Sequence, residues 1–168
     1  YFYEKLPIVE DNYAIYWDLL DLDNIFLSAL KPTIEMKEGG VLWIEKTKAA
    51  TIIDVDTSNL QLNSDEANLD FCKKVFIKCI EEIKLRNIGG MIIIDFPRVP
   101  FQSRKNLNEY ILKIGKEYFS DGSFLGFSRL QLYELYIPRN FAPLESFYKD
   151  DKDFEFRNHI RSLWRKSK

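Results

Sequence analysis

The hydrophobic positions in residues 15–30 predict a helix near the start of the chain. Acidic side chains alternate with apolar ones there, so one face of the helix is apolar and the other is polar. Pro32 then terminates the pattern, because proline cannot continue a helix. The apolar side chains at helical spacing are Leu19, Leu22, Phe26 and Leu30.

Two short β-branched runs follow a turn at residues 39–40, where two glycines stand together. The runs occupy residues 41–44 and 51–55, and a charged connector, residues 45–48, separates them. Short strands joined by a polar connector predict a β-hairpin. The second run is interrupted by Asp54 near its end.

A longer helix is predicted after Ser64, whose hydroxyl suits the N-cap position ahead of Asp65 and Glu66. The glycines at residues 89–90 are expected to stop this helix. Its apolar stripe has i, i+3, i+4 spacing. The stripe consists of Leu69, Cys72, Val75, Phe76, Cys79, Ile80 and Ile83.

Residues 91–94 form a near-continuous apolar run, which predicts a strand covered on both faces and ended by Asp95. Ser103 is expected to cap a further helix, and a last strand is expected around residues 130–135 before Pro138. The helical positions after Ser103 are Leu107, Tyr110, Ile111, Ile114 and Tyr118.

This order predicts an α/β fold: a mixed sheet with a β-hairpin followed by βαβ units, and helices packed on the sheet. We expect an N-terminal helical segment over residues 1–33 and the main domain over residues 34–142. A charged C-terminal extension is expected over residues 143–168, where the composition changes.

Composition narrows the class of protein. The chain has 168 residues, 46% of them hydrophobic and 15% aromatic, enough for a packed core. The net charge of −2 gives no overall attraction to nucleic acid, so any phosphate-binding surface must be local.

Cys72 and Cys79 are expected to be buried free thiols, and two Cys with one His exclude a structural zinc site. No apolar run reaches membrane-spanning length, and we expect a cytoplasmic protein.

Two aspartates are candidate metal ligands. Asp54 and Asp95 each follow an Ile-rich strand, and functional groups in α/β sheets gather at the carboxyl ends of strands. If the two strands are neighbours, the carboxylates converge and repel each other unless a cation lies between them. Oxygen ligands favour Mg²⁺ or Mn²⁺, and Asp56 lies two residues on, positioned for a third oxygen. Aspartates that only cap a turn are the alternative reading.

Several motifs, in order, resemble those of the ribonuclease E/G family. Residues 39–56, GGVLWIEKTKAATIIDVD, resemble its GG-x-I-x-I-x-x-T-E-A-L-x-x-I-D-V-N. Residues 85–96, LRNIGGMIIIDF, resemble its L-R-D-L-G-G-L-I-V-I-D-F, with its N-L-E matched at residues 68–69. Residues 127–135, FSRLQLYEL, resemble its I-S-R-F-G-L-L-E-M. Shorter matches lie at residues 16–17 and 22–23.

The resemblance implies the deoxyribonuclease-I-like catalytic subdomain of that family. Two aspartates matching Asp54 and Asp95 hold Mg²⁺ there, which activates water for attack on a phosphodiester of single-stranded RNA. The family's Asn, which helps position the site, falls at Asp56. The resemblance therefore implies a magnesium-dependent endoribonuclease of RNA processing or decay, with Asp54, Asp95 and Asp56 as its catalytic residues.

The chain departs from the family pattern in ways that keep a second reading open. Asp56 replaces Asn, Lys48 replaces Glu, and Pro97 with Arg98 replaces the Asp that usually follows. The cysteine motif of the family's inter-subunit zinc link is missing after Arg139, so any homo-oligomer would form without it. The alternative is a degenerate member that acts as an RNA-binding or assembly module. A nuclease acting on DNA would rest on fold analogy alone.

Four basic residues are candidate contacts to the RNA backbone: Arg98, Arg104, Lys105 and Arg129. A solvated helix face, or an Arg129–Glu134 ion pair, is the alternative reading. Phe96 and Phe101 are candidates for base stacking, although core packing is favoured in a chain so rich in Phe.

The C-terminal extension has the pattern of a basic amphipathic helix. Such a helix binds RNA, a partner or an acidic surface, or else docks on its own domain. Its apolar positions are Phe156, Ile160, Leu163 and Trp164, and its basic positions are Arg157, Arg161 and Arg165.

Overall fold

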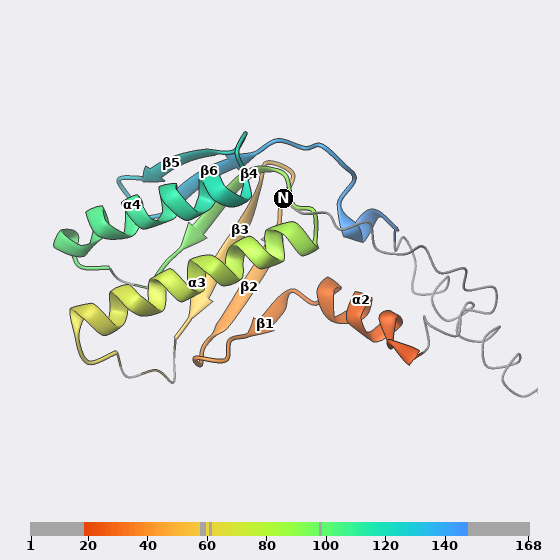
Figure 1. The fold of residues 1–168 in the computed structure, drawn as a ribbon, viewed down its shortest axis with the longest axis horizontal. Helices are drawn as coiled ribbons and strands as arrows, with labels where there is room; N and C mark the ends of the chain where they lie inside the picture. Colours follow the sequence, from red (N-terminus) through yellow and green to blue (C-terminus); the bar gives the residue numbers. More distant parts are fainter. Residues whose placement is uncertain (1–18, 58–59, 61, 98, 148–168) are drawn as a thin grey trace, which may run out of the picture. The chain divides into compact units, whose positions relative to one another are not determined.

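A computed structural model of the chain describes residues 19–57, 60, 62–97 and 99–147. Helices and strands alternate along most of this length (Figure 1). The elements are α2 (Leu22–Leu30), β1 (Thr33–Glu35), β2 (Val41–Lys46), β3 (Ala50–Asp56), α3 (Asp65–Leu85), β4 (Gly90–Asp95), α4 (Phe101–Tyr118), β5 (Ser123–Phe127), β6 (Tyr133–Ile137) and the 3₁₀ helix η1 (Leu144–Phe147).

The chain divides into two compact units, residues 1–31 and 32–168. Helix α2 belongs to the first unit and ends at Leu30, followed by Lys31 in an extended conformation. A residue before proline avoids the helical region because the proline ring crowds it, so the predicted termination at Pro32 is confirmed. Residues 15–18, where this helix was expected to begin, lie outside the described residues.

The second unit is built on a six-stranded mixed sheet with the order β1-β2-β3-β4-β6-β5. Strands β2 and β3 form the predicted antiparallel hairpin. Strand β4 runs parallel to β3, which requires the crossover that α3 provides. The α/β class is therefore confirmed, with β3-α3-β4 as its βαβ unit. After α4 the chain instead forms a hairpin of β5 and β6, and β6 pairs antiparallel to β4.

Helices α3 and α4 lie in front of the sheet in Figure 1. Side chains alternate along each strand, and the set that faces these helices is buried with the apolar stripes of both helices. The sheet positions of this core include Leu42, Ile44, Ile53, Val55, Ile92, Ile94, Tyr133 and Leu135. Among the described helices, none is long and apolar enough to span a membrane.

In the part of the chain that the structure describes, no helix of this unit covers the other face of the sheet, contrary to the prediction for β4. Strand β4 was expected to be buried on both faces, but Met91 is exposed and Ile93 is half-buried. The helices of this unit that the structure describes pack on the opposite face, because their single apolar stripes match only that face. The open face consequently retains several large apolar side chains.

Helix α3 begins as predicted and ends differently. The Ser64 side chain accepts a hydrogen bond from the backbone N–H of Ala67 at 3.1 Å. At the other end Asn87, with φ of 51°, reverses the chain ahead of the glycines. The N–H of Ile88 donates to the Ile83 carbonyl at 2.9 Å, which with the left-handed Asn87 makes a Schellman motif. The expected stop at residues 89–90 is therefore wrong, and Gly90 already belongs to β4.

The predicted cap of α4 is also wrong. Helix α4 begins at Phe101, so Ser103 lies inside its first turn. The N-cap is Pro100, whose carbonyl accepts from the N–H groups of Ser103 and Arg104 at 2.9 and 3.2 Å. A residue within the helix cannot adopt the extended backbone of an N-cap, so Ser103 cannot play that part.

Both cysteines are buried free thiols on α3, as predicted. Burial raises the pKa of Cys72 to about 12, and it raises the pKa of Cys79 as well. Desolvation disfavours the thiolate in each case. The two residues thus serve as core side chains rather than as nucleophiles.

The segment after β6 is anchored at the amino-terminal end of β4. Arg139 Nε donates to the Gly89 carbonyl at 3.1 Å, and Asn87 Nδ2 donates to the Ala142 carbonyl at 2.8 Å. Glu145 of η1 forms an ion pair with Lys46, the last residue of β2. The predicted basic amphipathic helix lies in residues 148–168, outside the described residues.

Candidate functional site

Asp54 and Asp95 lie side by side in the sheet. They are register partners on the parallel strands β3 and β4. Asp95 is the last residue of its strand, as predicted, but the prediction that Asp54 follows its strand is wrong, because β3 continues to Asp56. Partners on neighbouring parallel strands present their side chains to the same face, with the strands about 4.8 Å apart. Both side chains are exposed on the open face. The expectation that these two strands are adjacent and in register is confirmed.

Trp43 extends this pair into a row across three strands. It is the register partner of Asp54 on the other side, in β2. Leu42 and Ile44 turn into the core, so the side chain between them must face the open side. The row Trp43, Asp54, Asp95 therefore places an indole and two carboxylates at one level of the sheet.

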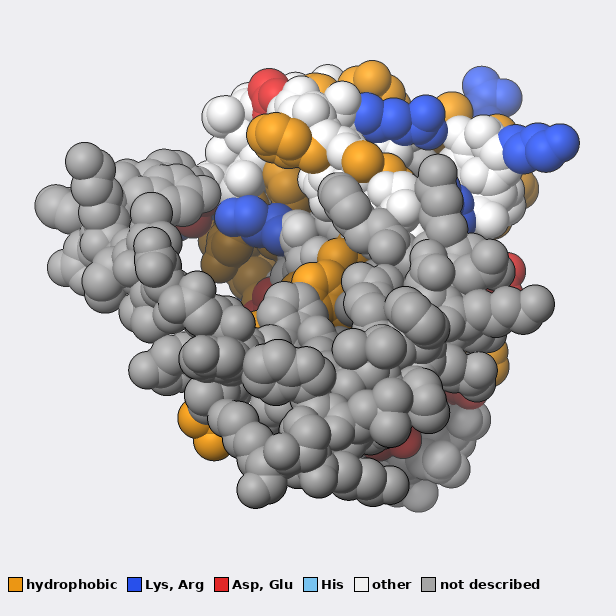
Figure 2. Space-filling model, turned by 90° about the vertical axis from the view of Figure 1, so that its right-hand side faces the viewer, with side chains coloured by type: hydrophobic (Ala, Val, Ile, Leu, Met, Phe, Trp, Pro, Cys, Tyr) orange, Lys and Arg blue, Asp and Glu red, His pale blue; other side chains and the backbone are white. Residues whose placement is uncertain are grey.

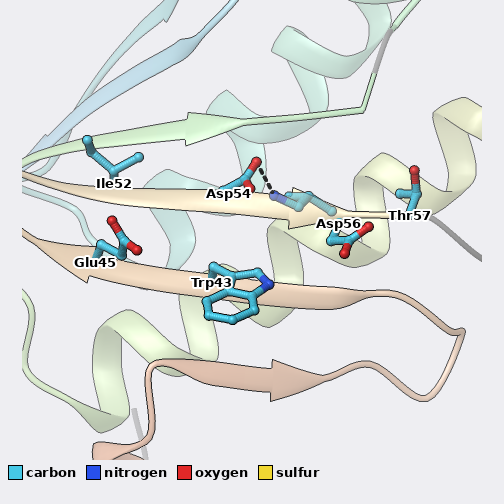
Figure 3. A pocket seen from close by; sticks show the side chains of 7 residues that line it. Trp43, Glu45, Ile52, Asp54, Asp56 and Thr57 are labelled. Carbon is cyan, nitrogen blue, oxygen red and sulfur yellow. Dashed lines mark hydrogen bonds between the residues drawn. The ribbon is translucent and has the colours of Figure 1, made fainter.

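The two carboxylates have different surroundings. Asp54 Oδ1 accepts a hydrogen bond from the backbone N–H of Val55 at 2.9 Å (Figure 3). In that view the Asp54 carboxylate points toward the neighbouring strand β4, drawn in green. Burial, and then the negative charge of Asp54, raise the pKa of Asp95. Two like charges held together in this way disfavour the ionised form of one of them.

A hollow of about 660 Å³ opens beside Asp54 on the side of β2. Figure 3 shows the indole of Trp43 on β2 and the carboxylates of Asp54 and Asp56 on β3. The hollow combines an apolar floor with several acidic groups. Its lining residues are Trp43, Glu45, Ile52, Asp54, Val55, Asp56 and Thr57.

Asp56 lines the same hollow as Asp54, two residues further along β3. Within the described part of the chain, no three His, Cys, Asp or Glu side chains gather closely enough to hold a metal ion together. The arrangement therefore offers two neighbouring carboxylates, with Asp56 beside them. The role predicted for Asp56 stays a prediction.

A smaller hollow of about 250 Å³ lies beside Asp95. Arg104 from α4 lines it, and hydrogen bonds fix its guanidinium group. Nε donates to the Val99 carbonyl at 3.0 Å, and Nη2 donates to Gln131 Oε1 at 2.7 Å. The guanidinium carbon also lies 5.8 Å from the centre of the exposed Phe101 ring. One predicted basic residue is thus held in the same hollow as a site carboxylate.

Two other predicted basic residues, Lys105 and Arg129, do not line the hollow beside Asp95. Lys105 is exposed on α4 and pairs with Glu109 at 3.9 Å. Arg129 is exposed between β5 and β6, and no ion pair among the described residues joins it to Glu134. Arg98 lies outside the described residues. Figure 2 shows the Lys and Arg side chains of one face at separate places rather than in one patch.

The two candidate stacking residues behave differently. Phe96 is buried, and its ring packs with Phe127 and Tyr133 at centroid distances of 6.2 Å each. This is the core packing that the sequence favoured. Phe101 is 82% exposed. The sequence analysis did not name Trp43 as a candidate site residue. The sequence pattern that could have identified it is its position between Leu42 and Ile44 in the predicted hairpin, since alternate side chains of a strand face opposite sides.

The chemistry of this donor set suits a hard divalent cation. Two exposed carboxylates on neighbouring central strands supply oxygen ligands and leave room for water, as Mg²⁺ and Mn²⁺ require. Burial first, and then the charge of Asp54, raises the pKa of Asp95. A cation between the carboxylates would offset the repulsion between them.

Two neighbouring carboxylates thus lie near the carboxyl ends of parallel strands, which is where ligands bind in open α/β sheets. The chain belongs to the Ribonuclease E/G family, whose model matches residues 4–139. The fold and the ordered motifs are thus those of one family.

Proteins with similar sequences carry names from the same family. The chain is 30% identical to Ribonuclease G of Haemophilus influenzae over 157 residues, covering 88% of this chain and 30% of that protein. It is 43% identical to Ribonuclease E of Synechocystis over 70 residues, covering 40% and 10%. It is 28% identical to a Ribonuclease E/G-like protein of Pyropia yezoensis over 156 residues, covering 89% and 30%. The chain thus spans about 30% of the length of the Ribonuclease G relative.

Proposed function

We propose that this chain carries the catalytic site of a metal-dependent endoribonuclease, which cleaves phosphodiester bonds of single-stranded RNA in RNA processing or decay. The observation that carries the proposal is the in-register pair of Asp54 and Asp95 on the two central strands, with both side chains exposed on one face of the sheet. Membership of the Ribonuclease E/G family and the names of the relatives support RNA as the substrate. A cytoplasmic setting fits this activity.

In this proposal Asp54 and Asp95 hold one Mg²⁺ or Mn²⁺ ion. When bound, the ion supplies Lewis acidity at the phosphodiester and a water of lowered pKa. The Val55 N–H holds the Asp54 carboxylate in place through its hydrogen bond to Oδ1. Asp56 lies within the same hollow and contributes further negative charge beside the site.

Arg104 is the basic residue best placed to hold the RNA backbone near the carboxylates. Its guanidinium group lines the hollow of Asp95 and is already oriented by Val99 and Gln131, so little side-chain freedom is lost on binding a phosphate. Lys105, Arg129 and Arg98 are assigned weaker backbone contacts. Such contacts contribute affinity without base specificity.

The alternative is a degenerate member that binds RNA without cleaving it. Its support is Asp56, which stands where the family motif has Asn and adds a carboxylate to a hollow that already holds Glu45 and Asp54. Extra negative charge opposes the approach of a phosphate. The two proposals therefore differ in catalysis, not in ligand.

The test is cleavage of a labelled single-stranded RNA by the full chain with Mg²⁺ or Mn²⁺. We expect cleavage by the parent protein and a loss of at least about a hundredfold in Asp54→Asn and in Asp95→Asn, since each removes one of two charged ligands. Asp121→Asn, in the exposed turn before β5, is the matched control and should cleave normally.

Cleavage that persists in both site variants would refute the assignment of the site. RNA binding without cleavage under either metal would instead favour the degenerate alternative. Activity that survives removal of divalent cations by a chelator would refute the requirement for a metal.

A further inference from the structure

The open face of the sheet exposes an indole beside the carboxylate pair. Trp43 is 41% exposed, although its ring is among the largest apolar groups in the chain. An aromatic ring of this size usually gains stability by burial. Other exposed apolar side chains share this face, so exposure alone does not distinguish Trp43. They are Ile52, Met91 and Tyr136.

Trp43 differs from the others in its position. It is the register partner of Asp54, and its ring lines the same hollow as that carboxylate (Figure 3). Neighbouring strands are about 4.8 Å apart, so the ring lies on the side of Asp54 away from Asp95. Tyr136, by contrast, pairs with Met91 near the other end of β4, roughly 13 Å along the strand from Asp95.

The chemistry of the hollow favours a nucleobase over a phosphate. Trp43 and Ile52 give it an apolar floor, while Glu45 and Asp56 add negative charge near Asp54. Carboxylates repel phosphate, but they accept hydrogen bonds from the amino groups of bases. A flat ring with amino groups at its edge fits an aromatic platform surrounded by carboxylates.

We propose that Trp43 is a stacking platform for one base of the RNA strand whose phosphodiester lies at Asp54 and Asp95. The inference rests on the proposed function for its ligand. Stacking on the indole fixes the nucleotide next to the scissile bond and so positions the strand. Because every base has a flat face, the platform gives affinity with little sequence preference.

The test measures binding of a ten-nucleotide single-stranded RNA of mixed sequence to the non-cleaving Asp95→Asn chain. Trp17 and Trp164 are replaced by Phe, which leaves Trp43 as the single fluorescent indole. We expect the RNA to quench this fluorescence, and an abasic strand of equal length to leave it unchanged. The abasic strand keeps the sugars and phosphates but has no base to stack on the indole.

Trp43→Ala should weaken RNA binding about tenfold, which corresponds to about 1.4 kcal/mol, measured by anisotropy of a labelled RNA. Trp43→Phe keeps a ring and should stay within about threefold of the parent affinity. Tyr136→Ala removes an equally exposed aromatic from the same face and should change nothing. Circular dichroism of each variant checks that the fold is retained.

The inference would be overturned by unchanged affinity in Trp43→Ala, by an equal loss in Tyr136→Ala, or by quenching by the abasic strand. Quenching that rises with protein concentration without RNA would also overturn it, by assigning the face to a second copy. If Asp54→Asn and Asp95→Asn abolish cleavage while Trp43→Ala binds normally, only the platform fails. If RNA quenches Trp43 but the parent chain never cleaves, catalysis fails and the platform stands.

Discussion

Asp95 is the carboxyl group of the pair whose ionisation is disfavoured. Its pKa is raised above the ordinary 3.8, first by burial and then by the charge of Asp54. A carboxyl group whose folded pKa is raised stabilises the fold most when it is protonated. That contribution is fully present below the unfolded pKa and is lost as the pH rises through the folded pKa. At neutral pH the ionised pair therefore lowers the free energy of unfolding.

We predict that Asp95→Asn melts at a higher temperature than the parent chain at pH 7 without divalent cations. The amide cannot ionise, so the partial burial of a charge and the repulsion with Asp54 both disappear. The difference should shrink as the pH is lowered through the raised pKa of Asp95 and the parent carboxyl becomes protonated. Thermal unfolding followed by circular dichroism measures this, with Asp121→Asn as the control. A lower melting temperature in Asp95→Asn at pH 7 would contradict the prediction.

At this scale the sequence identified the carboxylate pair but not the indole. Asp54 and Asp95 stand out because each ends an Ile-rich run within a motif of the family. Trp43 lies in an apolar run where either face of the strand could hold it. Only the pairing of β2 with β3 shows that its ring shares a face with Asp54.

At the scale of elements, the contact between α4 and β5 depends on one glycine. Gly115 is buried in α4, and a Cβ placed there would overlap ring atoms Cε1 and Cζ of Phe124 in β5. The Phe124 ring itself packs edge-on against Phe76 of α3 at 6.4 Å between centroids. The ring is therefore held between two helices and has little room to move.

Gly115→Ala is predicted to lower the free energy of unfolding by about 1–2 kcal/mol. Overpacking typically costs 1–3 kcal/mol, and the better helix propensity of Ala offsets up to about 1 kcal/mol. Chemical denaturation measures the change, and Lys113→Ala on the exposed side of α4 is the control. In a Phe124→Ala background the same substitution should become neutral or stabilising, because the overlap is gone. Equal destabilisation in both backgrounds would contradict this account.

The sequence correctly predicted the helices and strands in which regularly spaced apolar side chains recur over many residues. Helix α3 and the β2–β3 hairpin were located closely because each carries its own pattern of buried positions. Strands β1 and β5 were missed. The first has three residues at the sheet edge, and the second is interrupted at Gly126, where φ is 99° and the register shifts. Short or irregular edge strands form by pairing with a neighbour, not by local pattern.

At the scale of the molecule, a cation bound between Asp54 and Asp95 would stabilise the folded state as a whole. The two residues are separated by α3 in the chain and come together only when β3 pairs with β4. An unfolded chain offers no such pair, so binding free energy adds to folding free energy. The effect is measurable without any RNA.

Mg²⁺ at ten times its dissociation constant is predicted to raise the melting temperature by about 3–5 °C. This follows from about 1.4 kcal/mol of linked stabilisation and about 2–4 °C per kcal/mol for a chain of this size. Asp54→Asn and Asp95→Asn should lose the rise, whereas Asp121→Asn should keep it. An equal rise in the double variant at Asp54 and Asp95 would show that the ion binds elsewhere.

The sequence by itself determined the class of fold, the helix α3, the central hairpin and the candidate pair of Asp54 and Asp95. These features depend on local periodicity and on motifs contiguous in the chain. The tertiary structure decided which strands are neighbours, and hence that Asp54 and Asp95 are register partners with Trp43 beside them. It also decided that the described helices α3 and α4 pack on one face of the sheet and leave Met91 of β4 exposed on the other, contrary to the burial expected of that strand. Periodicity records which side chains are apolar, whereas only the packing of distant segments determines which of them are covered.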